Sequence, residues 1–109
     1  MLGGKPSADP FLLTGVLFGQ LGAEPVPKAY YRELESAPAF ERPMTWADID
    51  VAKLDALVLA GGHAPGMKQY LGSSRMHGMA SAFAATKKPL GAICHGTIVL
   101  ARAGALRGR

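Results

Sequence analysis

A short apolar strand and a helix meet in the sequence at Pro89-Leu90-Gly91-Ala92-Ile93-Cys94-His95-Gly96. Residues 90–93 form an apolar run entered from a Lys-Lys-Pro turn, which is typical of a buried strand. Residues 97–101 are mostly apolar and are followed by Ala103-Gly104, which indicates a helix that ends at a glycine. The single cysteine, Cys94, is therefore predicted at a strand-to-helix junction.

Small residues at Ala92 and Gly96 flank this cysteine and would let the backbone bend sharply. The pattern is a relaxed form of the nucleophile elbow, with sulfur in place of the serine oxygen. Such a junction places the sulfur at a helix N-terminus, where partial positive charge favours a thiolate over a thiol. The alternative is that Cys94 is simply a small buried apolar side chain.

A second stretch favours the nucleophile hypothesis. It comprises Asp55-Ala56-Leu57-Val58-Leu59-Ala60-Gly61-Gly62-His63-Ala64-Pro65-Gly66, again a short apolar strand that runs into a glycine-rich turn. It precedes the cysteine by roughly thirty residues, the spacing of one β-α-β unit. The carboxyl ends of neighbouring parallel strands lie side by side, and ligands bind there. The backbone N–H groups of Gly61 and Gly62 would then lie near Cys94 and could form an oxyanion hole.

The remaining pattern predicts helices over residues 27–37, 66–71 and 75–86. Ser73-Ser74 would cap the last of these, and its buried stripe would be Met76, Met79, Ala80 and Phe83. His77 falls off the stripe and is expected at the surface. The strands at residues 56–60 and 90–93 are apolar throughout, which predicts burial of both faces of their sheet.

Composition limits the class of protein. The 109 residues, 49% of them hydrophobic, suit one small globular domain. No apolar run approaches the ~18 residues of a membrane helix, and the N-terminus lacks the apolar core of a signal peptide. A lone cysteine forms no internal disulfide, so we expect a cytoplasmic protein without a membrane partner. The three histidines and one cysteine have no zinc-site spacing, so no metal or cofactor is expected.

Charge is unevenly divided along the chain. Residues 1–55 carry all eight acidic side chains and five basic ones, whereas residues 56–109 carry seven basic side chains and no acid. The basic residues are scattered without interleaved aromatics, so no nucleic-acid partner is expected. Two explanations remain, a positive field around an anionic thiolate or a chain that lacks an acidic partner segment, and we favour the second.

The two glycine-containing stretches and the end of the chain, Leu100-Ala-Arg-Ala-Gly-Ala-Leu-Arg-Gly-Arg109, resemble the ThiJ/PfpI superfamily. Within it they are most similar to type 1 glutamine amidotransferase domain-containing proteins. The resemblance implies an α/β fold, a three-layer flavodoxin-like parallel sheet with helices on both faces. The family's first strand and its C-terminal strands have no counterpart here, so residues 1–109 are expected to be a partial domain, incomplete at both ends.

The resemblance also implies a function. It is that of a cysteine-dependent hydrolase or lyase, such as a glyoxalase, deglycase or peptidase-like protein, acting on a small carbonyl, amide or glycated substrate. Cys94 would be the nucleophile and His95 its acid/base partner, while Gly61, Gly62 and His63 would line the oxyanion and substrate site. His95 could instead cap the helix or bind across a subunit interface, and His63 could be purely structural.

The family's glutamate at the end of the first strand has no counterpart in residues 1–109, which leaves enzymatic activity open. The alternative function is a non-catalytic redox-sensing or stress chaperone-like protein that uses an oxidisable Cys94. A glutaminase that feeds ammonia to a synthase would need a His-Glu pair that this sequence lacks. The expected partners are a small-molecule substrate and further copies of the chain, because open sheet edges recruit other strands.

Overall fold

A computed structural model describes residues 8, 10–16, 22–62 and 64–108. The chain divides into an N-terminal unit, Met1–Asp48, and a C-terminal unit, Ile49–Arg109. The N-terminal unit contains the helices α1 (Pro10–Thr14), α2 (Pro25–Glu35) and α3 (Pro38–Glu41). The C-terminal unit contains, in order, η2 (Val51–Lys53), β1 (Leu57–Leu59), α4 (Met67–Gly72), α5 (Ser74–Ala85), β2 (Leu90–Ala92) and α6 (Gly96–Arg102).

The C-terminal unit is built on the predicted β-α-β unit. Strands β1 and β2 pair in parallel, with Leu57 opposite Leu90 and Leu59 opposite Ala92. One further backbone hydrogen bond, from the Ile93 N–H to the Leu59 carbonyl at 3.0 Å, continues the ladder beyond β2. The strands are shorter than the predicted ranges, but their type, order and parallel direction are as expected. The fold class is therefore α/β.

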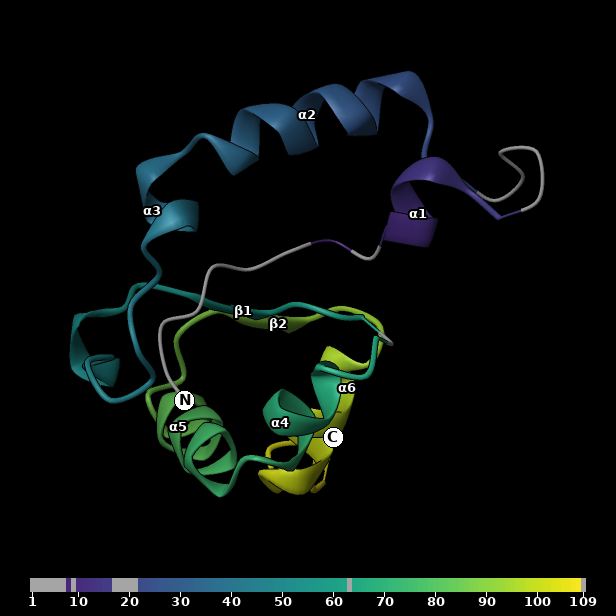
Figure 1. Cartoon of the computed structure of the whole chain (residues 1–109). Helices are drawn as coiled ribbons and strands as arrows, with labels where there is room; N and C mark the ends of the chain where they lie inside the picture. The colour runs from purple at the N-terminus through teal and green to yellow at the C-terminus, as the bar shows by residue number, and fades with distance from the viewer. Residues whose placement is uncertain (1–7, 9, 17–21, 63, 109) are drawn as a thin grey trace. The chain divides into compact units, whose positions relative to one another are not determined.

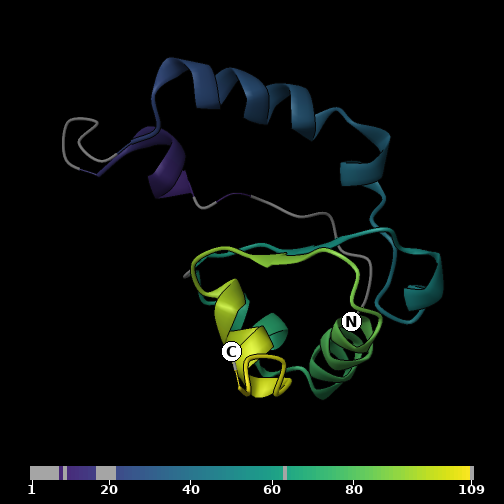
Figure 2. The same cartoon turned by 180° about the vertical axis from the view of Figure 1, so that it is seen from behind.

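Helices α4, α5 and α6 lie together on one face of these two strands (Figure 1), and the view from behind agrees (Figure 2). The Ser73 hydroxyl accepts the Met76 N–H at 3.2 Å and caps α5, as predicted. Three of the four residues of the predicted stripe of α5 are buried, and Met79 is half-buried. The buried hydrophobic residues of this unit are Leu59, Met76, Ala80, Phe83, Val99 and Leu100.

The opposite face of the strands differs from the expectation of burial on both sides. Val58 is 69% exposed and Ile93 is 66% exposed, whereas Leu59 is only 3% exposed. Successive side chains of a strand point to opposite faces, so Val58 points away from the layer that buries Leu59. The helices α4, α5 and α6 pack on the Leu59 side, and together with the two strands they form two layers. The three-layer arrangement stays a prediction.

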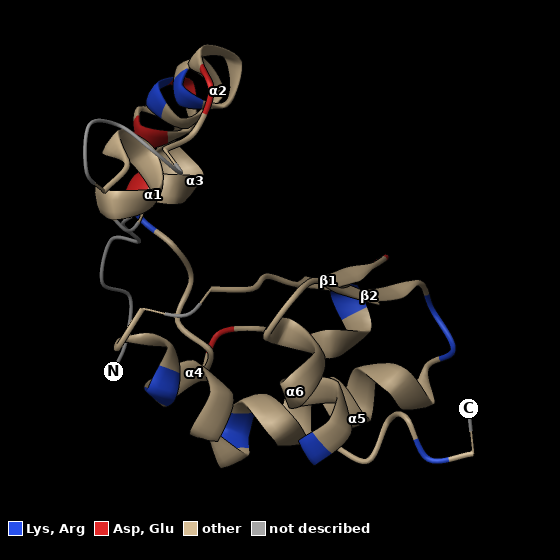
Figure 3. Cartoon of the chain, turned by 90° about the vertical axis from the view of Figure 1, so that its right-hand side faces the viewer, with Lys and Arg blue, Asp and Glu red and all other residues tan. Residues whose placement is uncertain are grey.

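Long-range hydrogen bonds from side chains tie the loops of the C-terminal unit together. The Lys88 ammonium donates to the carbonyls of Ala52 and Leu54 at 3.1 and 2.7 Å, which holds η2 and the residue after it against the turn that precedes β2. His77 is half-buried, with Nε2 2.8 Å from the Leu71 carbonyl, so its predicted surface position is wrong. The helices α4, α5 and α6 carry Lys and Arg but no Asp or Glu (Figure 3).

The N-terminal unit is helical. Its main helix begins at Pro25 rather than Pro27, in keeping with the preference of proline for the first helical turn. The rings of Tyr31 on α2 and Phe40 on α3 pack edge to face, with centroids 6.4 Å apart. None of the described helices, in either unit, has the length and apolar character needed to cross a bilayer.

Candidate functional site

Cys94 occupies the turn between β2 and α6. Its thiol is free and exposed, and its φ is +52°. This left-handed conformation costs an L-residue about 1–2 kcal/mol and is normally left to glycine. The sharp bend expected at the strand-to-helix junction is therefore present, and the cysteine itself adopts the strained conformation.

Glycines allow the two predicted stretches to meet. A Cβ atom on Gly61 would lie 2.6 Å from the Cys94 Cβ and 2.7 Å from the Ile93 carbonyl oxygen, so only glycine fits there. A Cβ on Gly96 would lie 2.8 Å from the Ala60 carbonyl oxygen, at the end of β1. The turn after β1 and the turn after β2 are thus in direct contact, as the parallel pairing predicts.

The His95 imidazole lies beside the thiol. Its Nδ1 is 3.4 Å from the Cys94 Sγ, within hydrogen-bond distance for sulfur. His95 stands at the N-cap of α6 but its side chain makes no capping hydrogen bond, so the helix-cap alternative is not the arrangement found. When unprotonated, Nδ1 can accept the thiol proton, and when protonated it can donate to a thiolate.

The first N–H groups of α6 are already used within the turn. The Gly96 N–H donates to the Ile93 carbonyl at 2.9 Å, and the Thr97 N–H donates to the Cys94 carbonyl at 3.2 Å. The N–H groups of Gly61, Gly62 and His95, by contrast, have no acceptor within the described part of the chain. These N–H groups, unlike those of the helix, are among the donors that the two contacting turns leave available.

Thr97 also contributes to the turn, although the sequence pattern did not predict this role. The Thr97 hydroxyl donates to the Cys94 carbonyl at 2.7 Å and helps to hold the bend. The available signal was a threonine in the first turn of a helix, a position where its hydroxyl commonly bonds the backbone.

The remaining predicted site residues are Gly62 and His63. Gly62 has a φ of +151°, and a Cβ there would lie 3.1 Å from the Met67 sulfur, so this position also requires glycine. His63 lies outside the described residues. Among the residues that the structure describes, no three His, Cys, Asp or Glu side chains gather as a metal site would require.

Comparison with known proteins places this geometry in context. A family model described as ThiJ/PfpI family-like matches residues 1–106. Protein DJ-1 homolog D of Arabidopsis thaliana is 36% identical over 66 residues, which cover 60% of this chain and 16% of that protein. Protein/nucleic acid deglycase 2 of Escherichia coli is 41% identical over 63 residues, covering 57% of this chain and 35% of that protein.

A third relative, the Pyridoxal 5'-phosphate synthase subunit PdxT of Bacillus licheniformis, is 27% identical over 84 residues, covering 77% of this chain and 42% of that protein. The chain thus spans less than half the length of each of these three relatives. No solved structure matches it significantly.

Proposed function

Because this chain belongs to the ThiJ/PfpI family, we propose that it carries out cysteine-dependent hydrolase or lyase chemistry with Cys94 as the nucleophile. The proposed substrate is a small carbonyl, amide or glycated compound. A relative that is named as a protein and nucleic acid deglycase supports the choice of glycated compounds within this class.

The observation that carries the proposal is the arrangement of the thiol. The Cys94 Sγ is exposed on a left-handed turn, 3.4 Å from a histidine nitrogen. A strained backbone at an exposed, potentially nucleophilic side chain is characteristic of functional sites. A purely structural cysteine would instead be buried among apolar side chains.

The proposed reaction begins with transfer of the thiol proton from Sγ to His95 Nδ1. The sulfur attacks the substrate carbonyl carbon, and the carbonyl electron pair moves to the oxygen. The N–H groups of His95 and Gly61 would donate to this oxyanion, and stabilisation of this kind usually contributes more to catalysis than any other single effect. His95 then returns its proton, to the leaving nitrogen for an amide or to the oxygen for an aldehyde, which leaves a thioester or a hemithioacetal on Cys94. For an α-oxoaldehyde such as methylglyoxal, the C1 proton of the hemithioacetal moves to C2, which converts it to a thioester. Water hydrolyses the thioester, which releases the acid and restores the thiol.

We expect the rate to be low. General acid–base help is worth about 10²–10⁴-fold, and among the described residues His95 is the acid/base group within hydrogen-bond distance of the thiol. The three-layer flavodoxin-like arrangement is part of the same proposal, and the exposed apolar Val58 and Ile93 support a further layer on their face of the sheet.

The test is consumption of methylglyoxal by the full chain, followed together with alkylation of the thiol. We expect weak turnover that is absent in Cys94→Ala. In the wild type it should fall in proportion to alkylation of the thiol, and it should be gone when one equivalent of iodoacetamide has reacted. Lys87→Ala is the matched control, because Lys87 is the other non-glycine residue with positive φ in the described chain, at +60°. This variant should keep the wild-type rate.

The alternative function predicts a different result. A redox-sensing or chaperone-like protein would show no Cys94-dependent turnover of methylglyoxal, and would still suppress aggregation of a heat-denatured client after its thiol is alkylated. Turnover that persists in Cys94→Ala would contradict both functions.

A further inference from the structure

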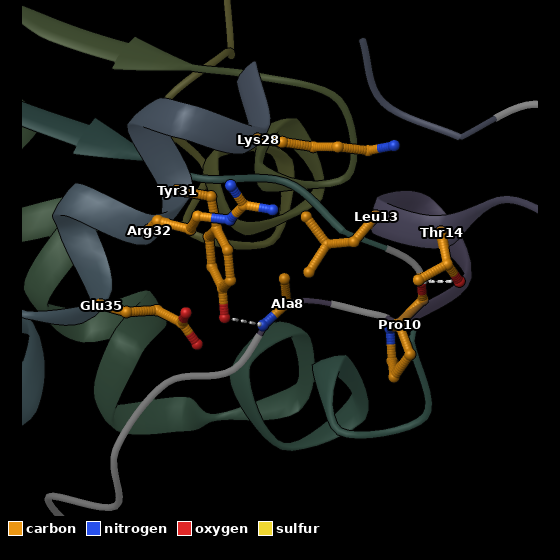
Figure 4. A pocket seen from close by; sticks show the side chains of 8 residues that line it. All are labelled: Ala8, Pro10, Leu13, Thr14, Lys28, Tyr31, Arg32 and Glu35. Atoms are coloured by element: carbon orange, nitrogen blue, oxygen red, sulfur yellow. Dashed lines mark hydrogen bonds between the residues drawn. The ribbon is translucent and has the colours of Figure 1, made fainter. Parts of the chain in front are cut away.

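A pocket in the N-terminal unit lies apart from the cysteine turn in the sequence and is not used by the proposed chemistry. It lies between α1 and α2, with Ala8 at its edge (Figure 4), and its volume is about 530 Å³. This volume falls within the ~300–1,000 Å³ that is typical of small-molecule sites. All its lining residues belong to one compact unit.

The walls of the pocket are apolar and one of them is held in place. Pro10 and Leu13 on α1 line one side, and the Tyr31 ring lines the other. The Tyr31 hydroxyl accepts the Ala8 N–H at 3.1 Å, and its ring packs edge to face on Phe40. Contacts at both ends of the tyrosine fix its orientation, so the cavity is formed before any ligand binds.

Two cations line the pocket one helical turn apart. Lys28 and Arg32 stand four residues apart on α2, so they share a face of the helix, and both side chains extend toward α1 (Figure 4). Neither side chain has an ion-pair or hydrogen-bond partner within the described part of the chain. Lys28 is nevertheless half-buried. Glu35 lines the same pocket, which leaves an excess of one positive charge.

The remaining polar groups are mainly donors. The Thr14 hydroxyl already donates to the Pro10 carbonyl at 2.9 Å. The Tyr31 hydroxyl accepts a hydrogen bond, and its own proton has no acceptor within the described residues. A ligand that satisfies these groups must therefore supply acceptors and one negative charge, together with an apolar body for the walls.

We propose that this pocket binds a small monocarboxylate with an apolar chain, its carboxylate between Arg32 and Lys28 and its chain against Leu13 and Pro10. The planar fork of a guanidinium matches the two oxygens of a carboxylate. A single negative charge balances the excess positive charge, whereas a phosphate dianion would exceed it. The proposal does not depend on the chemistry of Cys94.

The test is calorimetric titration of the full chain with octanoate, octanol and octylammonium. Octanoate should bind with saturation, and the other two, which share its chain length, should bind much more weakly. Shortening the acid to hexanoate removes two methylenes and should weaken binding about tenfold. Equal binding of octanol, or no saturable binding of octanoate, would overturn the proposal.

Variants locate the site. Lys28→Gln and Arg32→Gln should each weaken octanoate binding about two- to fivefold, the range of a partly exposed ion pair. Arg42→Gln, which removes an exposed cation of the same unit outside the pocket, should leave binding unchanged. If Arg42→Gln weakens binding as much as the other two variants do, the attraction is non-specific and the assignment is wrong.

Two further variants separate this result from loss of fold and from the proposed catalysis. Leu13→Ala should weaken octanoate binding through the chain alone, with all charges retained, and circular dichroism reports whether the helices persist. Cys94→Ala should bind octanoate as the wild type does. If the wild type binds octanoate but does not consume methylglyoxal, the catalytic proposal is wrong and the pocket proposal stands. If it consumes methylglyoxal but does not bind octanoate, the pocket proposal is wrong and the catalytic proposal stands.

Discussion

Replacing Cys94 with glycine should make the protein more stable while it removes the thiol. The φ of +52° at this position costs an L-residue about 1–2 kcal/mol, and glycine adopts it without strain. Glycine also gives the unfolded chain more conformational freedom, which offsets about 0.4–1 kcal/mol of that gain. The expected net increase in the free energy of unfolding is about 1 kcal/mol.

Urea unfolding followed by far-UV circular dichroism measures this increase. With a denaturant slope of about 1–2 kcal/mol/M, the midpoint should rise by roughly 0.5–1 M. Lys87→Gly, at a φ of +60°, should give a similar rise and keep the thiol. Cys94→Ala keeps the left-handed backbone and should give no rise. A neutral or destabilising Cys94→Gly, alongside a stabilising Lys87→Gly, would refute the argument that the cysteine turn is strained.

Four further predictions concern stability. Gly61→Ala should lower the free energy of unfolding by about 1–3 kcal/mol, because the new methyl group would lie 2.6 Å from the Cys94 Cβ. Gly78→Ala in α5, where nothing lies within 4 Å, should raise it by about 1 kcal/mol in the same urea titration. Lys88→Met should lower it by about 1–3 kcal/mol, because two hydrogen bonds to backbone carbonyls are lost. Burial raises the pKa of Tyr70 above 10.0, so the folded state keeps the phenol proton where the unfolded chain has lost it. This contribution to stability is complete below about pH 10 and is lost as the pH rises through the folded pKa, and urea midpoints of Tyr70→Phe should lack that part of the decline.

The β-α-β unit of the C-terminal half could be predicted because its signals are local. Short apolar runs bounded by glycine turns specify β1 and β2, and a 3.6-residue stripe specifies the buried face of α5. The exposure of Val58 could not be predicted in this way. Apolar side chains on both sides of a strand indicate that either face of the sheet can be buried. They do not determine which face the helices of this chain cover.

The candidate site was predictable to a similar depth. Parallel pairing places Gly61 beside Cys94, and the structure brings their backbones into contact. The left-handed φ of Cys94 and the approach of His95 Nδ1 to its sulfur depend on backbone and rotamer choices that residue spacing does not encode. The pocket between α1 and α2 is likewise formed by the packing of two helices, and no motif marks it.

The rate of alkylation measures how far the fold activates Cys94 as a nucleophile through His95. Intact-mass spectrometry at about pH 7 would compare iodoacetamide labelling of the folded chain, the urea-unfolded chain and folded His95→Ala, with Lys87→Ala as the control outside the cysteine turn. We expect folded wild type and Lys87→Ala to react faster than the unfolded chain, and His95→Ala to lose most of this advantage. Equal or slower labelling of the folded wild type, or an undiminished rate in His95→Ala, would contradict activation of the thiol by His95.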